Sequence, residues 1–485
     1  MKIKFSKKNL PFYFITLLGI ALLTYTSVRA GILSFTHDES LTYLRYVPKK
    51  FIQIVNYHSP SANNHIINTL LVKYIVQLFP EKEIFIRIPN LLAHASYIIF
   101  SVLIVKQFKN PFVFIGGFIL INFNPYMLDF FSLSRGYGLA LAFMLASIYS
   151  FFKYLKSNQK KYIYWYYILA AFAVLSNFVY LHYFVTTIIV FNLLIISELP
   201  VEKISFKTIS KENIPALIVS IILTIILFEP IRKLTKFNEL YGQGQKGFFS
   251  DTVISFINGT NYGQSYGQPY VKGISIVVMI LCALIFIAVS VELIQKKLRI
   301  KHSTQSIFFL FLILPALSSI MQHLILNDQL LTYRLTLIFV PLLGLSIISF
   351  CDYLKSYTWG KMASFFLLAV SAIMLIHTIK SANFLYYNDW KYDANTKNMI
   401  LKLEKEIPKE SKSNTIKLGI KWLFEPTINF YKETKNLDWL EKVNREGVDG
   451  DYDYYYILKD QLPELNHVEI IKEYNISNTL FLEEK

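Results

Sequence analysis

Two adjacent carboxylates stand beside an imidazole directly after the first long apolar stretch of the chain. The stretch covers residues 11–33, and His37, Asp38 and Glu39 follow it within the segment THDES. A run of this length spans a bilayer, so the carboxylates fall where a helix leaves the lipid. Acidic groups at that boundary lose hydration unless they have partners or a function. Because a positioned carboxylate can take a proton from an attacking hydroxyl group, this pair is the first candidate for chemistry.

Three arginines are candidates for binding an anion beside this pair, since basic residues are otherwise scarce in the short loops on the same side. They are Arg87 in EIFIRIPNLLA, Arg135 in SLSRGYG and Arg334 in LLTYRLTL. A guanidinium group donates two parallel hydrogen bonds to phosphate and stays ionised when desolvated. The other polar residues that we place with them are His65, Tyr137 and Tyr333. Together these residues predict a site that holds a lipid-linked phosphate while a hydroxyl group attacks and the phosphate leaves.

Each of these residues also has a simpler explanation. A single arginine at a helix end often anchors the helix at the lipid interface. Asp38 is a favourable N-cap for the next helix, and Asp129 is a possible partner of Arg135. A further alternative is a divalent metal ion held by His37, Asp38, Glu39 and His65, although their spacing matches no established ligand motif. The residues alone leave these alternatives open.

Membrane-spanning helices are the elements that must position these residues. The chain has 485 residues, of which 54% are hydrophobic, and apolar runs of about twenty residues recur along it. This pattern predicts an all-α polytopic membrane bundle of about eleven transmembrane helices. The expected spans are 11–33, 85–106, 111–131, 135–156, 162–178, 180–198, 213–231, 271–295, 305–326, 333–352 and 361–380. We do not count 63–79, because Lys73 lies in its middle, and we expect an amphipathic helix at the outer interface there.

Basic residues gather in alternate loops and predict the orientation of the bundle. The net charge is +16, and the clusters lie at 2–8, 106–109, 153–161, 203–211, 296–301 and 355–361. By the positive-inside rule, the N-terminus is cytoplasmic and the last hundred residues are extracytoplasmic. The chain contains no basic helix and no zinc-finger spacing, so the positive charge does not indicate nucleic-acid binding.

The composition divides the chain into a transmembrane domain at 1–381 and a small extracytoplasmic α/β domain at 382–485. The transmembrane domain carries two long outer loops, at 34–84 and 232–270. The second is rich in Gly, Gln, Asn and Tyr, which fits a mobile linker and a lid over a polar substrate equally well. In the C-terminal domain we expect strands at 415–424 and 451–459, a helix at 426–435, and one or two strands around Asn475.

Five motifs in this order resemble the GT-C superfamily of glycosyltransferases that use polyprenyl-phosphate sugars. They are THDES, NNHIINTLL, EIFIRIPNLLA, SLSRGYGLALAF and TYRLTLIFVPLL, within about residues 10–350. The similarity is to family 39, the branch of protein O-mannosyltransferases and lipid A aminoarabinose transferases. It implies transfer of a hexosyl or pentosyl group, with inversion, to a hydroxyl of a glycan, lipid or protein acceptor. It further implies a bacterial-type plasma membrane and a place in the synthesis of cell-envelope glycans or glycolipids.

The resemblance also assigns roles to residues. It makes Asp38 the leading carboxylate, a catalytic base or metal ligand, and Glu39 a second catalytic acid. It places Arg135 and Arg334 near the donor phosphate. His65 matches the histidine of the family's His-Pro-Pro-Leu stretch, but isoleucines replace both prolines here. The metal ion that it allows has Asp38, Glu39 and His65 as its candidate ligands.

Two other classes of function fit a chain of this kind. One is a transporter or flippase of a lipid-linked glycan, although such proteins more often show repeats, broken helices and ionisable groups at mid-membrane. The other is a non-catalytic scaffold that binds a cell-wall partner through residues 382–485. The polar candidates crowd one face of the predicted bundle, which favours chemistry at an interface.

Overall fold

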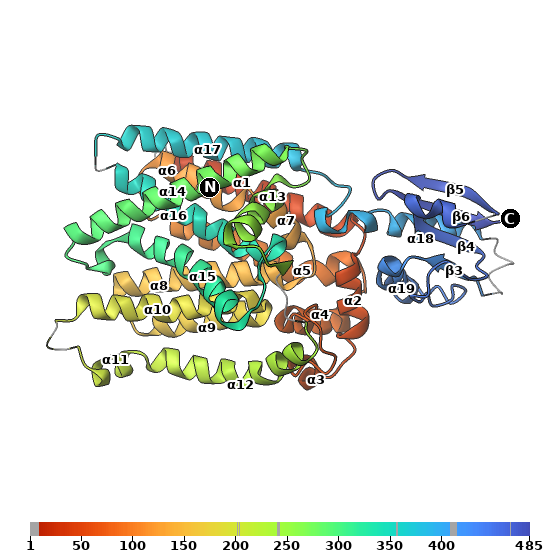
Figure 1. Cartoon of the computed structure of the whole chain (residues 1–485), viewed down its shortest axis with the longest axis horizontal. Helices are drawn as coiled ribbons and strands as arrows, with labels where there is room; N and C mark the ends of the chain where they lie inside the picture. The colour runs from red at the N-terminus through yellow and green to blue at the C-terminus, as the bar shows by residue number, and fades with distance from the viewer. Residues whose placement is uncertain are drawn as a thin grey trace, which may run out of the picture.

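The computed structural model is a helical bundle with a small sheet-containing domain at one end (Figure 1). It describes residues 9–200, 202, 204–239, 243–355, 357–407, 415–465 and 467–485. The basic residues at 2–8 and Lys203, which contribute to the predicted orientation, lie outside the described residues.

The long helices of the bundle match the apolar runs of the sequence. The first seven bundle helices are α1 (Leu10–Ile32), α5 (Glu83–Val105), α6 (Pro111–Asn122), α7 (Pro125–Ser132), α8 (Gly136–Ser157), α9 (Lys161–Ser176) and α10 (Leu181–Glu198). The later ones are α12 (Ile214–Lys236), α14 (Gln268–Gln295), α15 (Thr304–Leu326), α16 (Phe339–Leu354) and α17 (Gly360–Ser381).

Among the described residues, nine helices are long and apolar enough to cross a membrane. Helices α6 and α7, bent by 61° at Phe123 and Asn124, form a tenth if they count as one span. The remaining expected span, 162–178, is α9, a shorter helix of 16 residues packed against α8. The protein is therefore an integral multi-pass membrane protein, and the predicted fold class is confirmed.

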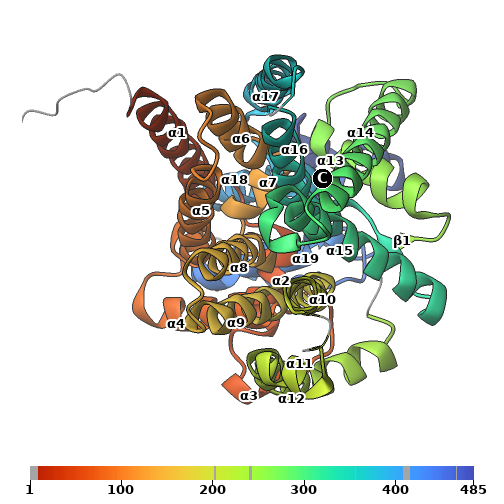
Figure 2. The same cartoon turned by 90° about the vertical axis from the view of Figure 1, so that its left-hand side faces the viewer.

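The outer helices expose the apolar side chains that a lipid-facing surface requires. In α14, only 17% of the most apolar 18-residue stretch is buried within the protein, whereas 72% of the corresponding stretch of α8 is buried. Figure 2 looks along the bundle and shows α8 between α5 and α9, whereas α1 and α12 lie at the periphery. An exposed apolar surface of this extent is expected only where lipid covers it.

The two long loops, 34–84 and 232–270, carry secondary structure in their described residues. Loop 34–84 forms α2 (His37–Arg45), α3 (Phe51–Val55) and α4 (Ile66–Leu78). Helix α4, where we expected an interfacial helix, is apolar but has only 13 residues. In the described part of loop 232–270 the elements are β1 (Gln243–Gly244), the π-helical turn η4 (Phe248–Val253) and α13 (Ile254–Asn261). Strand β1 pairs with β2 (Leu330–Leu331), so this part of the loop is joined to the segment before Arg334.

Asp129 pairs with Arg29 and not with Arg135. The Arg29 Nη1 lies 2.5 Å from the Asp129 Oδ1 in a fully buried contact. The hydroxyl of Tyr262, which follows α13, donates to the same oxygen at 2.8 Å. This buried pair therefore ties α1, α7 and the loop at 232–270 together, and it leaves Arg135 available for other partners.

The C-terminal domain has the predicted α/β composition. Its helices are α18 (Thr396–Glu406) and α19 (Glu425–Thr434), and its strands are β3 (Leu418–Ile420), β4 (Tyr454–Leu458), β5 (Val468–Tyr474) and β6 (Thr479–Glu484). The strand order is β3-β4-β6-β5, with β3 parallel to β4 and the other pairs antiparallel. Two strands flank the turn at Asn475, as the sequence predicts.

The domain is fixed to the end of the bundle that carries His37, Asp38 and Glu39. Its helix α19 packs against α2, as Figure 1 shows at the right. The ring of Phe35 stacks on Phe430 with 4.1 Å between centroids. The Phe35 N–H also donates to the Tyr431 hydroxyl at 2.8 Å. Because one apolar cluster contains residues of both parts, the domain adjoins the candidate site.

Candidate functional site

The acidic pair lies in the first turn of α2, which begins with a capping box. The N-cap is Thr36, whose hydroxyl accepts a hydrogen bond from the Glu39 N–H, while the Thr36 N–H donates to the Glu39 carboxylate at 3.1 Å. This reciprocal arrangement satisfies two backbone donors of the helix start. Asp38 therefore does not cap the helix, and its side chain points elsewhere.

Glu39 is buried in an ion pair with Arg87. The Arg87 Nε donates to Oε1 at 2.8 Å, and Nη2 donates to Oε2 at 2.7 Å. The Ser134 N–H, at 2.6 Å, and the Thr36 N–H and hydroxyl complete five hydrogen bonds to the two oxygens. Both side chains are 0% exposed. Glu39 thus joins α2 to α5 and to the SLSRGYG motif.

Arg87 has no donor left for a ligand. A guanidinium group carries five N–H donors. Two bind Glu39, and three bind the backbone carbonyls of Ala30, Leu33 and Ser34, each at 3.0 Å. The structure places Arg87 at the predicted end of the bundle, but every donor already binds the protein. Its geometry is that of a buried structural pair.

Asp38 is held differently, because two arginines contact only one of its oxygens. The Arg334 Nη1 lies 2.9 Å and the Arg135 Nη2 3.3 Å from Oδ2. The other oxygen, Oδ1, accepts no hydrogen bond from any residue in the described ranges and is not enclosed. The side chain is 17% exposed. Asp38 therefore offers one free carboxylate oxygen beside two positive charges.

These neighbours keep Asp38 ionised. Burial by itself raises the pKa of the Asp38 carboxyl, but Arg135, Arg334 and His37 outweigh it and hold that pKa below its ordinary value. At neutral pH the group is a carboxylate that can accept a proton or a hydrogen bond. The ring of His37 is itself fixed by the C-terminal domain, since Nδ1 lies 2.7 Å from the Leu423 carbonyl oxygen.

Arg135 lies behind Asp38 and is largely occupied. Its Nη1 donates to the Asn63 Oδ1 at 2.5 Å and to the Asn63 carbonyl at 3.2 Å. Asn63 in turn donates from Nδ2 to the Asp38 carbonyl at 2.9 Å. Arg135 is 2% exposed, so its main effect is to orient α2 and to supply positive charge. The sequence reasoning missed Asn63, although it stands in the NNHIINTLL motif two residues before His65.

Arg334 is the arginine with open donors. Its side chain is 32% exposed, and Nη1 binds Asp38. Within the described parts of the chain, Nε and Nη2 donate to nothing, and neither is enclosed. The guanidinium plane lies over the Trp390 ring, 5.5 Å from its centroid, which leaves its edge available for a phosphate. Trp390 was not among the predicted residues, because nothing in the sequence places residue 390 next to residue 334.

His65 and Tyr137 form the wall of this site. Their rings meet edge to face with 5.3 Å between centroids. Gly136 permits this contact, because a Cβ atom at that position would lie 1.8 Å from the Ser176 carbonyl oxygen and 2.7 Å from the His65 ring. Burial, with the charges of Arg135 and Arg334, holds the pKa of His65 well below its ordinary value, so the imidazole is neutral. Its Nε2 is enclosed without a partner among the described residues.

Tyr333 is the most exposed of the predicted site residues. The residue is 52% exposed, and its backbone has φ of 44°. The Tyr333 N–H donates to the Ser255 hydroxyl of α13 at 3.1 Å. Tyr333 therefore sets the turn that carries Arg334, and a role of its side chain in substrate binding stays a prediction.

The three predicted metal ligands do not form a ligand set. Both oxygens of Glu39 are occupied by Arg87, Ser134 and Thr36, which leaves Asp38, His65 and the fourth candidate, His37, whose Nδ1 lies 2.7 Å from the Leu423 carbonyl oxygen. Across the described residues, no group of three or more His, Cys, Asp or Glu side chains is placed to hold a metal ion. We therefore derive no step that depends on a metal.

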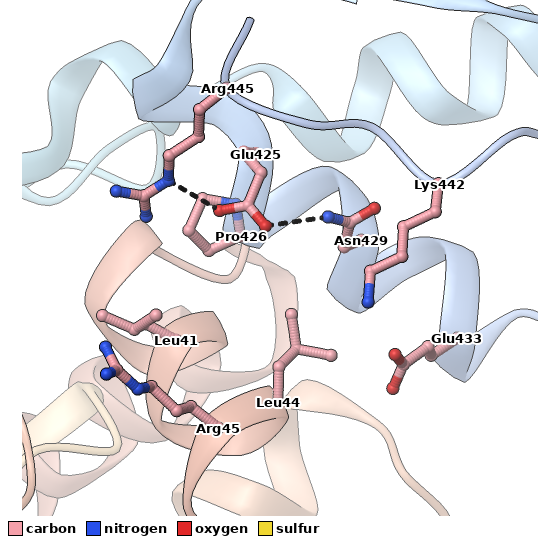
Figure 3. A pocket seen from close by; sticks show the side chains of 9 residues that line it. All are labelled: Leu41, Leu44, Arg45, Glu425, Pro426, Asn429, Glu433, Lys442 and Arg445. Carbon is pink, nitrogen blue, oxygen red and sulfur yellow. Dashed lines mark hydrogen bonds and ion pairs between the residues drawn. The ribbon is translucent and has the colours of Figure 1, made fainter. Parts of the chain in front are cut away.

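A cavity of about 360 Å³ lies nearby, between α2 and α19 (Figure 3). Leu41, Leu44 and Arg45 line it from α2, and Glu425 and Glu433 line it from α19. Asp38, Arg135 and Arg334 are not among its lining residues. This cavity is therefore a feature of the domain boundary, separate from the acid and arginine cluster.

Two solved structures share the fold of this chain. ArnT from Cupriavidus metallidurans in the apo state is 9% identical with a TM-score of 0.55, and the match covers 96% of this chain and 97% of ArnT. The structure of ArnT bound to undecaprenyl phosphate is 10% identical with a TM-score of 0.50 and the same coverage. No protein-family model and no curated protein matches the sequence. The chain thus has the same fold as ArnT over nearly its whole length.

Proposed function

We propose that this protein is a membrane glycosyltransferase that moves a sugar from a polyprenyl-phosphate donor to an acceptor hydroxyl group. The fold is that of ArnT, which has been solved with undecaprenyl phosphate bound. The single observation that carries the proposal is the open Oδ1 of Asp38 beside the open donors of Arg334. A base and an anion-binding group in contact are the two groups that such a transfer needs.

The reaction is an inverting displacement. The acceptor hydroxyl gives its proton to Asp38, and its oxygen forms a bond to the anomeric carbon of the sugar. The bond between that carbon and the phosphate oxygen breaks, and the electron pair leaves with polyprenyl phosphate. Arg334 faces the negative charge that grows on the leaving phosphate, and its stacking on Trp390 keeps its donors in place.

The other predicted residues act through Asp38 and Arg334. Glu39 and Arg87 position the first turn of α2, in place of the direct roles that the sequence suggested for them. Arg135 supplies charge and orients Asp38, and neutral His65 with Tyr137 shapes the wall. This assignment makes Asp38 the base and leaves Glu39 outside the chemistry.

We place the site on the extracytoplasmic side of a bacterial-type plasma membrane. The alternating basic loops support a cytoplasmic N-terminus and an extracytoplasmic C-terminal domain. The partners are a polyprenyl-phosphate-linked sugar, membrane lipid, and an acceptor that is a glycan, lipid or protein. The product belongs to cell-envelope glycan or glycolipid synthesis, with a hexosyl or pentosyl group transferred.

Deletion of the gene provides the test. We expect the lipid-linked sugar donor to accumulate in membranes, where mass spectrometry identifies it. Expression of the wild type should clear the donor, and Asp38→Asn should clear it about 100- to 10,000-fold more slowly, because removal of a general base costs this much. Asp352→Asn is the matched control, since this carboxylate in the last turn of α16 pairs with Lys355 in a partly exposed contact outside the site.

Full activity of the Asp38→Asn variant at normal protein levels would overturn the proposal. A second outcome would favour a transporter or flippase: net movement of the lipid-linked sugar across proteoliposomes without a new glycosidic bond. The polar residues that we assign lie at one end of the bundle, which supports the transferase.

A further inference from the structure

A short 3-10 helix from outside the predicted transmembrane domain packs Trp390 against Arg334 and carries a second carboxylate, that of Asp389, one residue earlier. This element, η7 (Asn388–Asp393), follows α17 and is fixed to the bundle by contacts away from Arg334. The Tyr387 hydroxyl donates to the Ser132 carbonyl at 3.0 Å, and the Asn388 N–H donates to Asp129 at 2.9 Å. The hydrogen bonds of Tyr387 and Asn388, the two residues before Asp389, therefore fix the position of Asp389.

Asp389 itself has one engaged oxygen and one open oxygen. The hydroxyl of buried Tyr126 donates to Oδ2 at 2.7 Å. In the part of the chain that the structure describes, no group donates to Oδ1, and this atom is not enclosed. The next residue, Trp390, has its ring beneath the Arg334 guanidinium group, 5.5 Å from it, so the backbone holds Asp389 beside that arginine. Burial raises the pKa of the Asp389 carboxyl, while Arg334 and Tyr126 oppose that change.

An open carboxylate oxygen beside a phosphate-binding arginine has a restricted range of ligands. It repels the phosphate itself, and it accepts hydrogen bonds from hydroxyl or ammonium groups. In a polyprenyl-phosphate sugar, the part covalently next to the phosphate that carries such groups is the sugar. The polyprenyl chain offers no donor at all.

We infer that Asp389 binds a hydroxyl or amino group of the donor sugar and so helps to determine which sugar is transferred. The inference rests on the proposed function and adds a substrate contact to it. Asp389, and not Glu39, is then the second carboxylate of the site, next to the catalytic Asp38. Tyr126 is its positioning residue, because the Tyr126 hydroxyl fixes which oxygen of Asp389 remains open.

Binding of two lipids to the full-length protein in detergent separates this role from a merely structural one. The probes are undecaprenyl phosphate and the undecaprenyl-phosphate-linked sugar isolated from the deletion strain. For Asp389→Asn we expect affinity for the sugar-linked lipid to fall about tenfold or more. Affinity for undecaprenyl phosphate should stay the same or rise, because a negative charge near Arg334 is lost. Tyr126→Phe should also reduce the affinity for the sugar-linked lipid selectively, by a smaller factor.

The matched control is Tyr97→Phe, which removes a buried tyrosine hydrogen bond to the Ile121 carbonyl in the core of the bundle and none within the site or at η7. It should leave both affinities unchanged. If Asp389→Asn reduces the affinity for both lipids equally, Asp389 only positions Arg334 and the inference is overturned. Unchanged affinity for both lipids would also overturn it. If Asp389→Asn does not fold, Tyr126→Phe gives the same comparison. Failure of the wild type to bind either lipid would instead contradict the proposed function.

Discussion

Glu39 and Asp38 are neighbours in the chain, yet the protein treats their carboxylates in opposite ways. Glu39 receives five hydrogen bonds across both oxygens, and its partner Arg87 uses all five of its donors within the protein. Asp38 receives both of its arginines on one oxygen, and Arg334 keeps donors open. One acid and arginine pair is closed, and the other is open to a ligand.

The difference shows which pair is built for structure and which for chemistry. A buried charge is tolerated only when its partner and its hydrogen bonds are complete, and a complete pair has nothing left for a substrate. An incomplete pair is tolerated where solvent or a ligand can reach it, as at Asp38. Proximity to the THDES motif alone does not distinguish the two.

Substitution of Arg87 breaks the closed pair with Glu39 and should have the largest effect on the free energy of unfolding. Arg87→Ala leaves Glu39 charged in a dry site and should cost about 3–5 kcal/mol of unfolding free energy. Arg334→Ala is the matched comparison, because its pair with Asp38 is partly exposed and should contribute about 1 kcal/mol or less to stability. Equilibrium unfolding in mixed micelles measures both variants.

The same two variants should reverse their order in ligand binding. Arg334→Ala should lose most of its affinity for undecaprenyl phosphate, whereas Arg87→Ala, once folded, should retain it. If Arg87→Ala is as stable as the wild type, the closed pair does not hold α2 in place, and the contrast between the two pairs fails.

Asp393 offers a third case, because it is a buried carboxylate that pairs with no arginine among the described residues. It accepts hydrogen bonds from the His37 N–H at 2.7 Å and from the Thr396 hydroxyl at 3.1 Å. Burial raises its pKa to about 8, and the charge of Asp38 adds to this shift. The folded pKa lies above the unfolded one, so this contribution to stability is complete below about pH 4 and is lost as the pH rises toward about 8.

Between pH 6 and 8 the wild type should therefore lose about 2–3 kcal/mol of unfolding free energy through this group, at roughly 1.4 kcal/mol per pH unit. The Asp393→Asn variant should show a smaller decrease over the same range. Parallel unfolding titrations at the two pH values provide the measurement. An identical pH dependence in variant and wild type would show that Asp393 is already ionised at pH 6.

Gly136→Ala should disturb the site at Asp38 and Arg334, because Gly136 permits the contact between His65 and Tyr137 that forms its wall. The added methyl group meets the Ser176 carbonyl oxygen and the His65 ring, and we expect a loss of about 1–3 kcal/mol in stability from overpacking. Activity should fall further than stability explains, because Arg135 precedes this glycine directly. Gly273→Ala is a suitable control, since nothing lies within 4 Å of its added carbon atom. Equal behaviour of the two variants would rule out the contact at Gly136.

Much of the fold could be predicted because lipid imposes a simple rule on the sequence. Each of the expected spans corresponds to a helix or a bent pair, and the strands on both sides of Asn475 lie where alternation placed them. The pairing of Asp129 was wrong, because a loop position does not reveal that α1 brings Arg29 to within 2.5 Å. The lid or linker alternative for 232–270 likewise depended on a pairing with β2 that the local sequence does not encode.

The sequence by itself determined which chemical groups this protein possesses and at which end of its helices they lie, because hydropathy and charge follow from composition along the chain. Only the tertiary structure decided which arginine each carboxylate receives. That choice depends on atoms brought together from residues 39 and 87, or 38 and 334, and no local pattern fixes it. The same holds for Asp389 and Trp390, which reach Arg334 only because the segment after α17 folds back over the end of the bundle.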